Sequence, residues 1–266
     1  MFVPGQIIRR RELHSLYGGQ EQGGISTPAN HPFIMLFTAP SGLSHGYEDG
    51  WTESSIFLYT GEGQLGDMSF VRGNCALRDH LQDGKDVYLF ESVDRGLVRY
   101  VGQMIVTGYH ERTGGDSAGN QRHAIVFELI PVDDMHRQIP DSANHEGLSL
   151  SSIPENELRR IAESPSSAET TPDERRKSAQ KRSRALREYV LRRAGGNCEG
   201  CGNRAPFVTD RGIPYLEVHY LRRPSDVGPE SPLWVAALCP NCHRRVHWGG
   251  DASEYNQRII ENIATG

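Results

Sequence analysis

The chain has 266 residues, enough for two modest domains with one core each, and its formal net charge of −5 argues against a protein that is basic over its whole surface. Its apolar runs fall well short of the roughly 20 residues that a membrane-spanning helix needs. The first residues lack the basic and apolar segments of a secretory signal, so we expect a cytoplasmic protein. In that compartment clustered cysteines indicate metal ligands rather than disulfides.

Residues 1–132 predict a mostly β domain. Short apolar or alternating runs, rich in β-branched and aromatic residues, are separated by Gly, Asp and Ser. These runs cover residues 33–37, 56–59, 87–90, 98–101 and 124–129. We expect a curved sheet or barrel, flanked by short helices over 9–17 and 72–80.

The segment 133–173 is poor in large apolar residues and rich in Ser, Pro, Glu and Asn, which predicts a polar flexible linker. A helical turn near 158–163 is expected inside it. Thr171-Pro172-Asp173-Glu174 then has the pattern of a helix start, with Thr171 as N-cap. The helix should run to Ala194 and end at the following two glycines, so a C-terminal domain is assigned to 174–266.

This helix is strongly basic over 175–193, where Glu188 is the only acidic residue. Its cations either contact DNA phosphates or form an ordinary solvated face, and the sequence favours neither. Leu186, Tyr189, Val190 and Ala194 share one face at helical spacing. The first three of these residues could provide a contact in a homodimer.

Two C-x2-C pairs follow the helix. Cys198 and Cys201 form the first pair, and Cys239 and Cys242 form the second. Each pair can place two thiolates from one tight turn at two corners of a tetrahedron, and two pairs together make a closed structural Zn²⁺ site. Metal binding would supply much of the folding free energy of so small a domain.

The segment Tyr215-Leu-Glu-Val-His-Tyr220 lies between the pairs, and the second pair opens a helical segment that carries His243 and His247. Over about residues 195–250 this order resembles the HNH, or ββα-metal, nuclease family. The resemblance implies that His219 and His243 bind a catalytic divalent ion, Mg²⁺, Mn²⁺ or another metal. His247 lies one helical turn after His243 on the same face and could be a further ligand.

The sequence departs from the HNH pattern at two positions. Tyr220 stands where the family has a general-base histidine, and Trp234 stands where it has an asparagine that orients the base. A tyrosine has a pKa near ~10, so it acts as a base at neutral pH only if a metal or a cation lowers that value. Arg222 and Arg223 are close enough in sequence to help. A slow nuclease, a nuclease with an activated Tyr220 and a domain kept for DNA binding all stay open.

The N-terminal part carries His45-Gly-Tyr-Glu-Asp-Gly-Trp51, followed by Tyr59-Thr60-Gly61. Over about residues 18–130 this arrangement resembles the SRA (YDG) domain, a β-barrel fold that binds 5-methylcytosine after flipping it from the duplex. The resemblance places Tyr47 and Tyr59 on the two faces of the flipped base.

Further positions of the base pocket follow from the same resemblance. A carboxylate that accepts a hydrogen bond from the cytosine amino group selects C over T, and Asp49 is the candidate, with Asp67 as the fallback. Thr60 would line the methyl side, and Trp51 either stacks on the base or packs in the core. Gln22, in the Gly-rich loop 18–24, matches the position that enters the gap left by the flipped base.

Together the two resemblances identify the chain as an α+β protein of the SRA–HNH modification-dependent restriction type, which implies a bacterial, cytoplasmic endonuclease. Its expected partner is double-stranded DNA that contains 5-methylcytosine. Two alternatives remain: a non-catalytic or very weakly cleaving reader of methylated DNA, and a related β domain that reads RNA or another modified base.

Overall fold

The computed structural model describes residues 2–39, 49–52, 55–132, 150–164, 171–210, 212–221 and 231–265. The chain divides into two compact units. The first comprises Met1–Leu81 with Lys85–Gln138, and the second comprises Ile139–Gly266 with Gln82–Gly84. Among the described residues, no helix combines the length and the apolar character that crossing a membrane requires.

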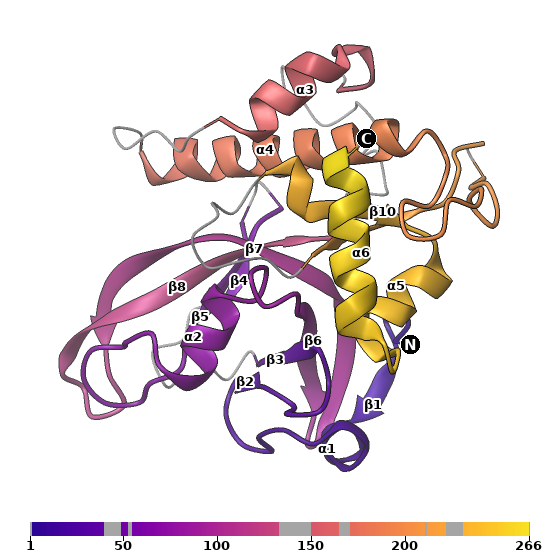
Figure 1. The fold of residues 1–266 in the computed structure, drawn as a ribbon. Coiled ribbons are helices and arrows are strands. Elements are labelled where there is room, and N and C mark those ends of the chain that lie inside the picture. The colour runs from indigo at the N-terminus through magenta and orange to yellow at the C-terminus, as the bar shows by residue number, and fades with distance from the viewer. Residues whose placement is uncertain are drawn as a thin grey trace. The chain divides into compact units, whose positions relative to one another are not determined.

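The first unit is built on one eight-stranded sheet (Figure 1). The strands run in the order β2-β3-β6-β7-β8-β5-β4, with β1 paired to β7, and only the β3–β6 pair is parallel among the described pairs. Their bounds are β1 (Ile7–Arg9), β2 (Ile25–Ser26), β3 (Phe33–Thr38), β4 (Gly50–Trp51), β5 (Phe57–Thr60), β6 (Asp86–Asp94), β7 (Leu97–Gly115) and β8 (Gln121–Pro131).

The apolar runs of the sequence form these strands because their side chains fill the core. Every residue of β3 is buried, which matches its continuous apolar sequence. The two predicted flanking helices are present as α1 (Arg10–Tyr17) and α2 (Arg72–Arg78). The mixed α+β class with a large sheet is confirmed. Closure of that sheet into a barrel stays a prediction, because the pairing of the described strands ends at β2 and β4.

The second unit combines a two-stranded antiparallel sheet with helices (Figure 1). The pair β9–β10 aligns His219 with Ala236 and Glu217 with Leu238. The bounds are η3 (Leu150–Ser152), α3 (Glu155–Ala162), α4 (Pro172–Ala194), β9 (Glu217–Tyr220), η4 (Pro232–Trp234), β10 (Val235–Leu238), α5 (Pro240–Trp248) and α6 (Ala252–Thr265).

The basic helix α4 begins and ends where its sequence predicts. The Thr171 hydroxyl accepts a hydrogen bond from the backbone N–H of Glu174. In return the Glu174 carboxylate accepts one from the backbone N–H of Thr171, so both backbone donors of the first turn are satisfied. Gly195 closes the helix in the left-handed conformation, with φ of 56°. The face that carries Leu186 and Val190 is buried in the core of its own unit. The idea that these residues form a dimer contact is therefore wrong.

Part of the segment predicted as a flexible linker is folded. Helix α3 lies along α4 (Figure 1), and its Leu158 and Ala162 are fully buried. Arg192 of α4 donates hydrogen bonds to the carbonyl oxygens of Leu150 and Ile153, at 2.8 and 2.6 Å. Two apolar side chains and one arginine thus order a stretch whose average composition is polar.

Candidate functional sites

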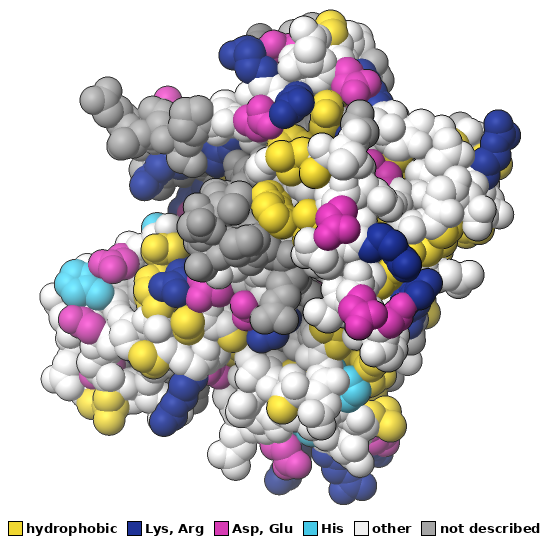
Figure 2. All heavy atoms as spheres, viewed as in Figure 1, with side chains coloured by type: hydrophobic (Ala, Val, Ile, Leu, Met, Phe, Trp, Pro, Cys, Tyr) yellow, Lys and Arg dark blue, Asp and Glu magenta, His cyan; other side chains and the backbone are white. Residues whose placement is uncertain are grey.

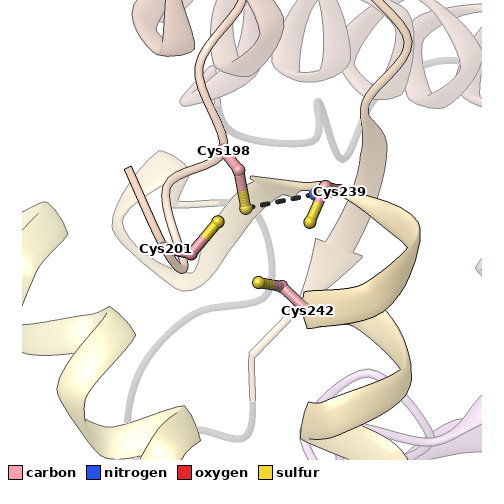
Figure 3. Close-up of side chains that lie close together, drawn as sticks. All are labelled: Cys198, Cys201, Cys239 and Cys242. Atoms are coloured by element: carbon pink, nitrogen blue, oxygen red, sulfur yellow. Dashed lines mark hydrogen bonds between the residues drawn. The ribbon is translucent and has the colours of Figure 1, made fainter. Parts of the chain in front are cut away.

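The four cysteines of the two C-x2-C pairs converge in the second unit (Figure 3). Cys198 and Cys201 lie in the turn after α4, Cys239 follows β10, and Cys242 lies in the first turn of α5. Their sulfur atoms all lie within 4.8 Å of one another. Cys198 Sγ also accepts a hydrogen bond of 3.1 Å from the backbone N–H of Cys239, which ties the two turns together.

The surroundings of the thiols hold them in this arrangement. Glu199 forms a bidentate ion pair with Arg193, at 2.7 and 3.0 Å, and its carboxylate accepts a hydrogen bond from the backbone N–H of Ala237. The buried Tyr255 donates its hydroxyl to Cys242 Sγ at 2.9 Å. Burial raises the pKa of the Cys242 thiol, so a nearby cation is needed to favour its thiolate. Four converging sulfur donors fit a tetrahedral metal such as Zn²⁺, so this cluster could hold that ion.

A second cluster joins the three histidines that the sequence singled out. His219 lies on β9, and His243 and His247 lie one turn apart on α5. The ring centroids are 4.6–5.0 Å apart, and the Nε2 atoms of His243 and His247 are separated by 3.2 Å. One ring nitrogen from each residue lies within 4.8 Å of the others. Three imidazoles at this spacing can bind one divalent ion from one side.

Glu217 belongs to this site, although the sequence reasoning did not single it out. Its Oε2 atom lies 2.6 Å from His243 Nδ1, and its Oε1 atom accepts the hydroxyl of Tyr215 at 3.1 Å. Burial raises the pKa of Glu217, but the hydrogen bond from His243 and the other nearby donors outweigh it, so the pKa lies below its ordinary value. Strand alternation was the available signal, because Glu217 and His219 are two residues apart and share a face.

The two departures from the HNH pattern lie at the same hairpin. Tyr220 follows His219 and is partly buried, opposite Val235. Trp234 contributes its backbone carbonyl, which accepts the N–H of Leu221 at 2.8 Å. Arg222 and Arg223 lie outside the described residues.

The predicted base pocket centres on Asp49 in the first unit. Asp49 Oδ1 accepts the N–H of Thr60 at 2.7 Å, and Oδ2 accepts the hydroxyl of Thr38 at 2.9 Å. Burial raises the pKa of Asp49, and these two hydrogen bonds and Arg112 only partly oppose that effect. The Thr60 hydroxyl also lies 3.5 Å from a guanidinium nitrogen of Arg112. Asp49 and Thr60 are therefore brought together, and Thr38 joins them from β3.

The aromatic candidates occupy different environments. Trp51 is 50% exposed and touches Phe57 edge-on, so it is not a core residue. Tyr59 is 1% exposed, and its hydroxyl lies 3.5 Å from the Phe37 carbonyl oxygen. Tyr47 lies outside the described residues. The fallback Asp67 is exposed and accepts the backbone N–H of His123 at 2.7 Å, away from the Asp49 contacts.

The loop 18–24, which carries Gln22, is held near both ends by contacts of helix α1 with its backbone. His14 Nδ1 lies 3.2 Å from the Gly18 carbonyl oxygen, and Arg10 donates to the Gly23 carbonyl oxygen at 2.7 Å. The Arg10 guanidinium also lies 3.9 Å from the centre of the Phe37 ring. Gln22 itself is exposed at the loop surface. Its side chain is thus free of the core, while the backbone on either side is held.

The visible surface carries both signs of charge. Lys and Arg side chains are interspersed with Asp and Glu (Figure 2), in keeping with the net charge of −5. Any contact with a polyanion must therefore come from local groups rather than from a uniform field.

The chain is similar to known restriction enzymes in sequence and in structure. It is 40% identical over 78 residues to the type IV methyl-directed restriction enzyme EcoKMcrA of Escherichia coli strain K12, a match that covers 29% of this chain and 28% of that relative. The structure of the phosphorothioation-dependent restriction endonuclease ScoMcrA aligns with all of this chain and 60% of that one, at 20% identity and a TM-score of 0.45.

A third similarity concerns the first half of the chain. The SUVH5 SRA domain in complex with hemimethylated CG DNA aligns with 50% of this chain and 89% of that one, at 24% identity and a TM-score of 0.38. The chain thus spans less than a third of its curated relative and 60% of the first solved structure. Residues 4–149, more than half of the chain, match the family model described as the ScoMcrA-like SRA domain. The protein therefore belongs to the family with a ScoMcrA-like SRA domain.

Proposed function

We propose that this protein is a modification-dependent DNA endonuclease. Its SRA unit binds duplex DNA and flips out a 5-methylcytosine, and its second unit is an HNH nuclease that hydrolyses a nearby phosphodiester bond. The observation that carries the proposal is the convergence of His219, His243 and His247 on a strand–strand–helix scaffold beside four clustered thiols. The 40% identity over 78 residues to a methyl-directed restriction enzyme supports the same activity.

In this proposal the first unit chooses the target. A flipped base costs a few kcal/mol of lost stacking and pairing, which new contacts must offset. Asp49 is held by Thr38 and Thr60 and would accept the cytosine N4 amino group. Trp51 offers an exposed ring for stacking, and Gln22 would fill the vacated space in the duplex. The buried Tyr59 can reach a base only if the side chains that cover it move aside.

The second unit would perform the cleavage. The four thiolates would hold Zn²⁺ as a structural ion, and the three histidines would hold the catalytic ion through neutral imidazoles. A divalent ion there would stabilise the charge that develops on the phosphate and on the leaving oxygen. Tyr220 follows His219 at the end of β9, and it would take the proton of the attacking water once a cation, such as the divalent ion itself, lowers its pKa.

Tyr220 and Trp234 also favour a second candidate function. A reader of methylated DNA without nuclease activity would keep the scaffold and lose the usual base and the residue that orients it. The two functions differ in one outcome, strand scission, whereas both require selective DNA binding.

A nicking assay separates the two functions. Supercoiled plasmid, with and without 5-methylcytosine, is incubated with the purified chain and Mn²⁺, Co²⁺ or Mg²⁺. We expect relaxed circles only with methylated plasmid and a divalent ion, and no nicking by His243→Ala, whose zinc content and DNA binding should be unchanged. Selective binding without nicking under any of the ions would establish the reader, and equal binding to both plasmids would refute both functions.

A further inference from the structure

We propose that Glu217 is the positioning residue of the three-histidine site, because it holds the imidazole proton of His243 on Nδ1 and so puts the lone pair that a metal ion needs on Nε2. This inference rests on the proposed metal site and assigns a task to a side chain for which the HNH resemblance implied no role. Glu217 is 8% exposed, so its carboxylate is shielded from water and keeps its protein partners.

The two ring nitrogens of His243 face different partners. Nδ1 lies 2.6 Å from Glu217 Oε2, and Nε2 lies 3.2 Å from the Nε2 atom of His247. An ionised carboxylate only accepts hydrogen bonds, so the nitrogen that faces it must carry the proton. In neutral imidazole the other nitrogen then keeps its lone pair, and here that nitrogen lies on the side of His247.

The carboxylate is itself fixed. Tyr215 donates its hydroxyl to Oε1 at 3.1 Å, so Oε2 remains for His243. The Tyr215 ring stacks on Phe207, with centroids 4.6 Å apart and an angle of 17° between the planes. Glu217 also shares its strand and its side-chain face with His219, so one short strand supplies a ligand and the group that orients a second ligand.

Groups that orient a metal-binding histidine contribute to metal affinity without touching the ion. In Glu217→Gln the amide can donate to Nδ1 as readily as it can accept from it. Donation would shift the imidazole proton to Nε2 and block metal binding there. We therefore expect the dissociation constant for Co²⁺ at this site to rise about 10- to 100-fold in Glu217→Gln.

The experiment is a calorimetric titration of the zinc-replete 266-residue chain with Co²⁺ in the absence of DNA. Tyr215→Phe removes one hydroxyl that holds the carboxylate, and we expect a smaller loss of affinity, about two- to tenfold. Glu254→Gln, at an exposed position on α6, is the matched control and should bind Co²⁺ like the parent. Zinc content and the unfolding midpoint, measured for every variant, report whether the scaffold is intact.

A second measurement reads the imidazole directly. Long-range ¹H–¹⁵N spectra of zinc-replete protein without Co²⁺ should show His243 with its proton on Nδ1 in the parent and a mixture of both forms in Glu217→Gln. An Nε2-protonated His243 in the parent, or unchanged Co²⁺ affinity in folded Glu217→Gln, would overturn the inference. If Glu217→Gln does not fold, unchanged affinity in Tyr215→Phe would overturn it. Both readouts omit DNA, so they are independent of whether the protein cuts.

Discussion

Replacing Asp49 by Asn should change the stability of the protein and its affinity for the modified base in opposite directions. Asn has the same shape and can accept the Thr60 N–H that Asp49 Oδ1 accepts at 2.7 Å. Its amide group can donate to the Thr38 hydroxyl, which in the parent donates to Oδ2 at 2.9 Å. Both contacts can therefore persist, and the substitution removes only the buried negative charge.

The removed charge has a predictable effect on stability. Burial raises the pKa of Asp49 above its ordinary value of 3.8, so the native state binds this proton more tightly than the unfolded state does. The stabilising contribution of that proton is complete below the unfolded pKa and is lost as the pH rises through the native pKa. At pH 7 we therefore expect Asp49→Asn to be at least as stable as the parent in urea unfolding, with its advantage shrinking toward pH 4.

The affinity for the modified duplex should fall in Asp49→Asn, although the stability at pH 7 does not. An Asn amide nitrogen cannot accept the cytosine amino group, and one base-edge contact is worth about 1–3 kcal/mol. That range corresponds to a roughly 5- to 150-fold weaker binding of a 5-methylcytosine duplex, measured by fluorescence anisotropy at fixed salt. Asp67→Asn is the matched control and should bind like the parent. Unchanged affinity in Asp49→Asn, together with a loss in Asp67→Asn, would show that Asp67 is the reading carboxylate.

Three more predictions concern the second unit. In Gly200→Ala the new Cβ would lie 2.6 Å from the Tyr255 hydroxyl oxygen and 3.2 Å from Cys242 Cβ. We therefore expect the free energy of unfolding in urea to fall by about 1–3 kcal/mol and zinc to be released faster to a chelator. Zinc release at the rate of the parent would contradict this packing. Leu186→Ala should cost about 2–5 kcal/mol in the same assay, because the side chain is 1% exposed in the core, and it should leave the sedimentation coefficient unchanged. His219→Glu should raise the ratio of Mg²⁺- to Co²⁺-supported nicking several-fold, and an unchanged ratio would argue against His219 as a ligand.

Local rules were sufficient for several parts of the second unit. The N-cap pattern at Thr171 and the glycines after Ala194 set both ends of α4, because capping depends on neighbouring residues alone. The C-x2-C spacing predicted for the same reason that the two thiols of each pair lie close together, whereas the meeting of the two pairs is a contact between distant segments. The pairing of His243 with His247 followed from helical periodicity.

Contacts between distant segments were not predictable in this way. Thr38 reaches Asp49 from a strand that is not adjacent to β4 or β5 in the sheet, so no local pattern joins the two residues. The order of α3 depends on Leu158, Ala162 and Arg192, whose contacts a composition average hides. The role of Glu217 could not be predicted either, because an acidic residue on a strand ordinarily indicates the solvent side, whereas here a histidine and a tyrosine from other positions satisfy it.

Three imidazole ligands have a consequence for the metal and for the substrate. Imidazoles are neutral when they bind, so the three histidines would leave the full double charge of a divalent ion for the phosphate. Glu217 is separated from the space between the histidines by the width of the His243 ring, so it would strengthen that ligand without contacting the ion. Imidazole also suits Co²⁺, Ni²⁺ and Zn²⁺ better than Mg²⁺, which prefers oxygen ligands. Nicking should therefore depend steeply on the identity of the divalent ion, with Co²⁺ supporting it better than Mg²⁺.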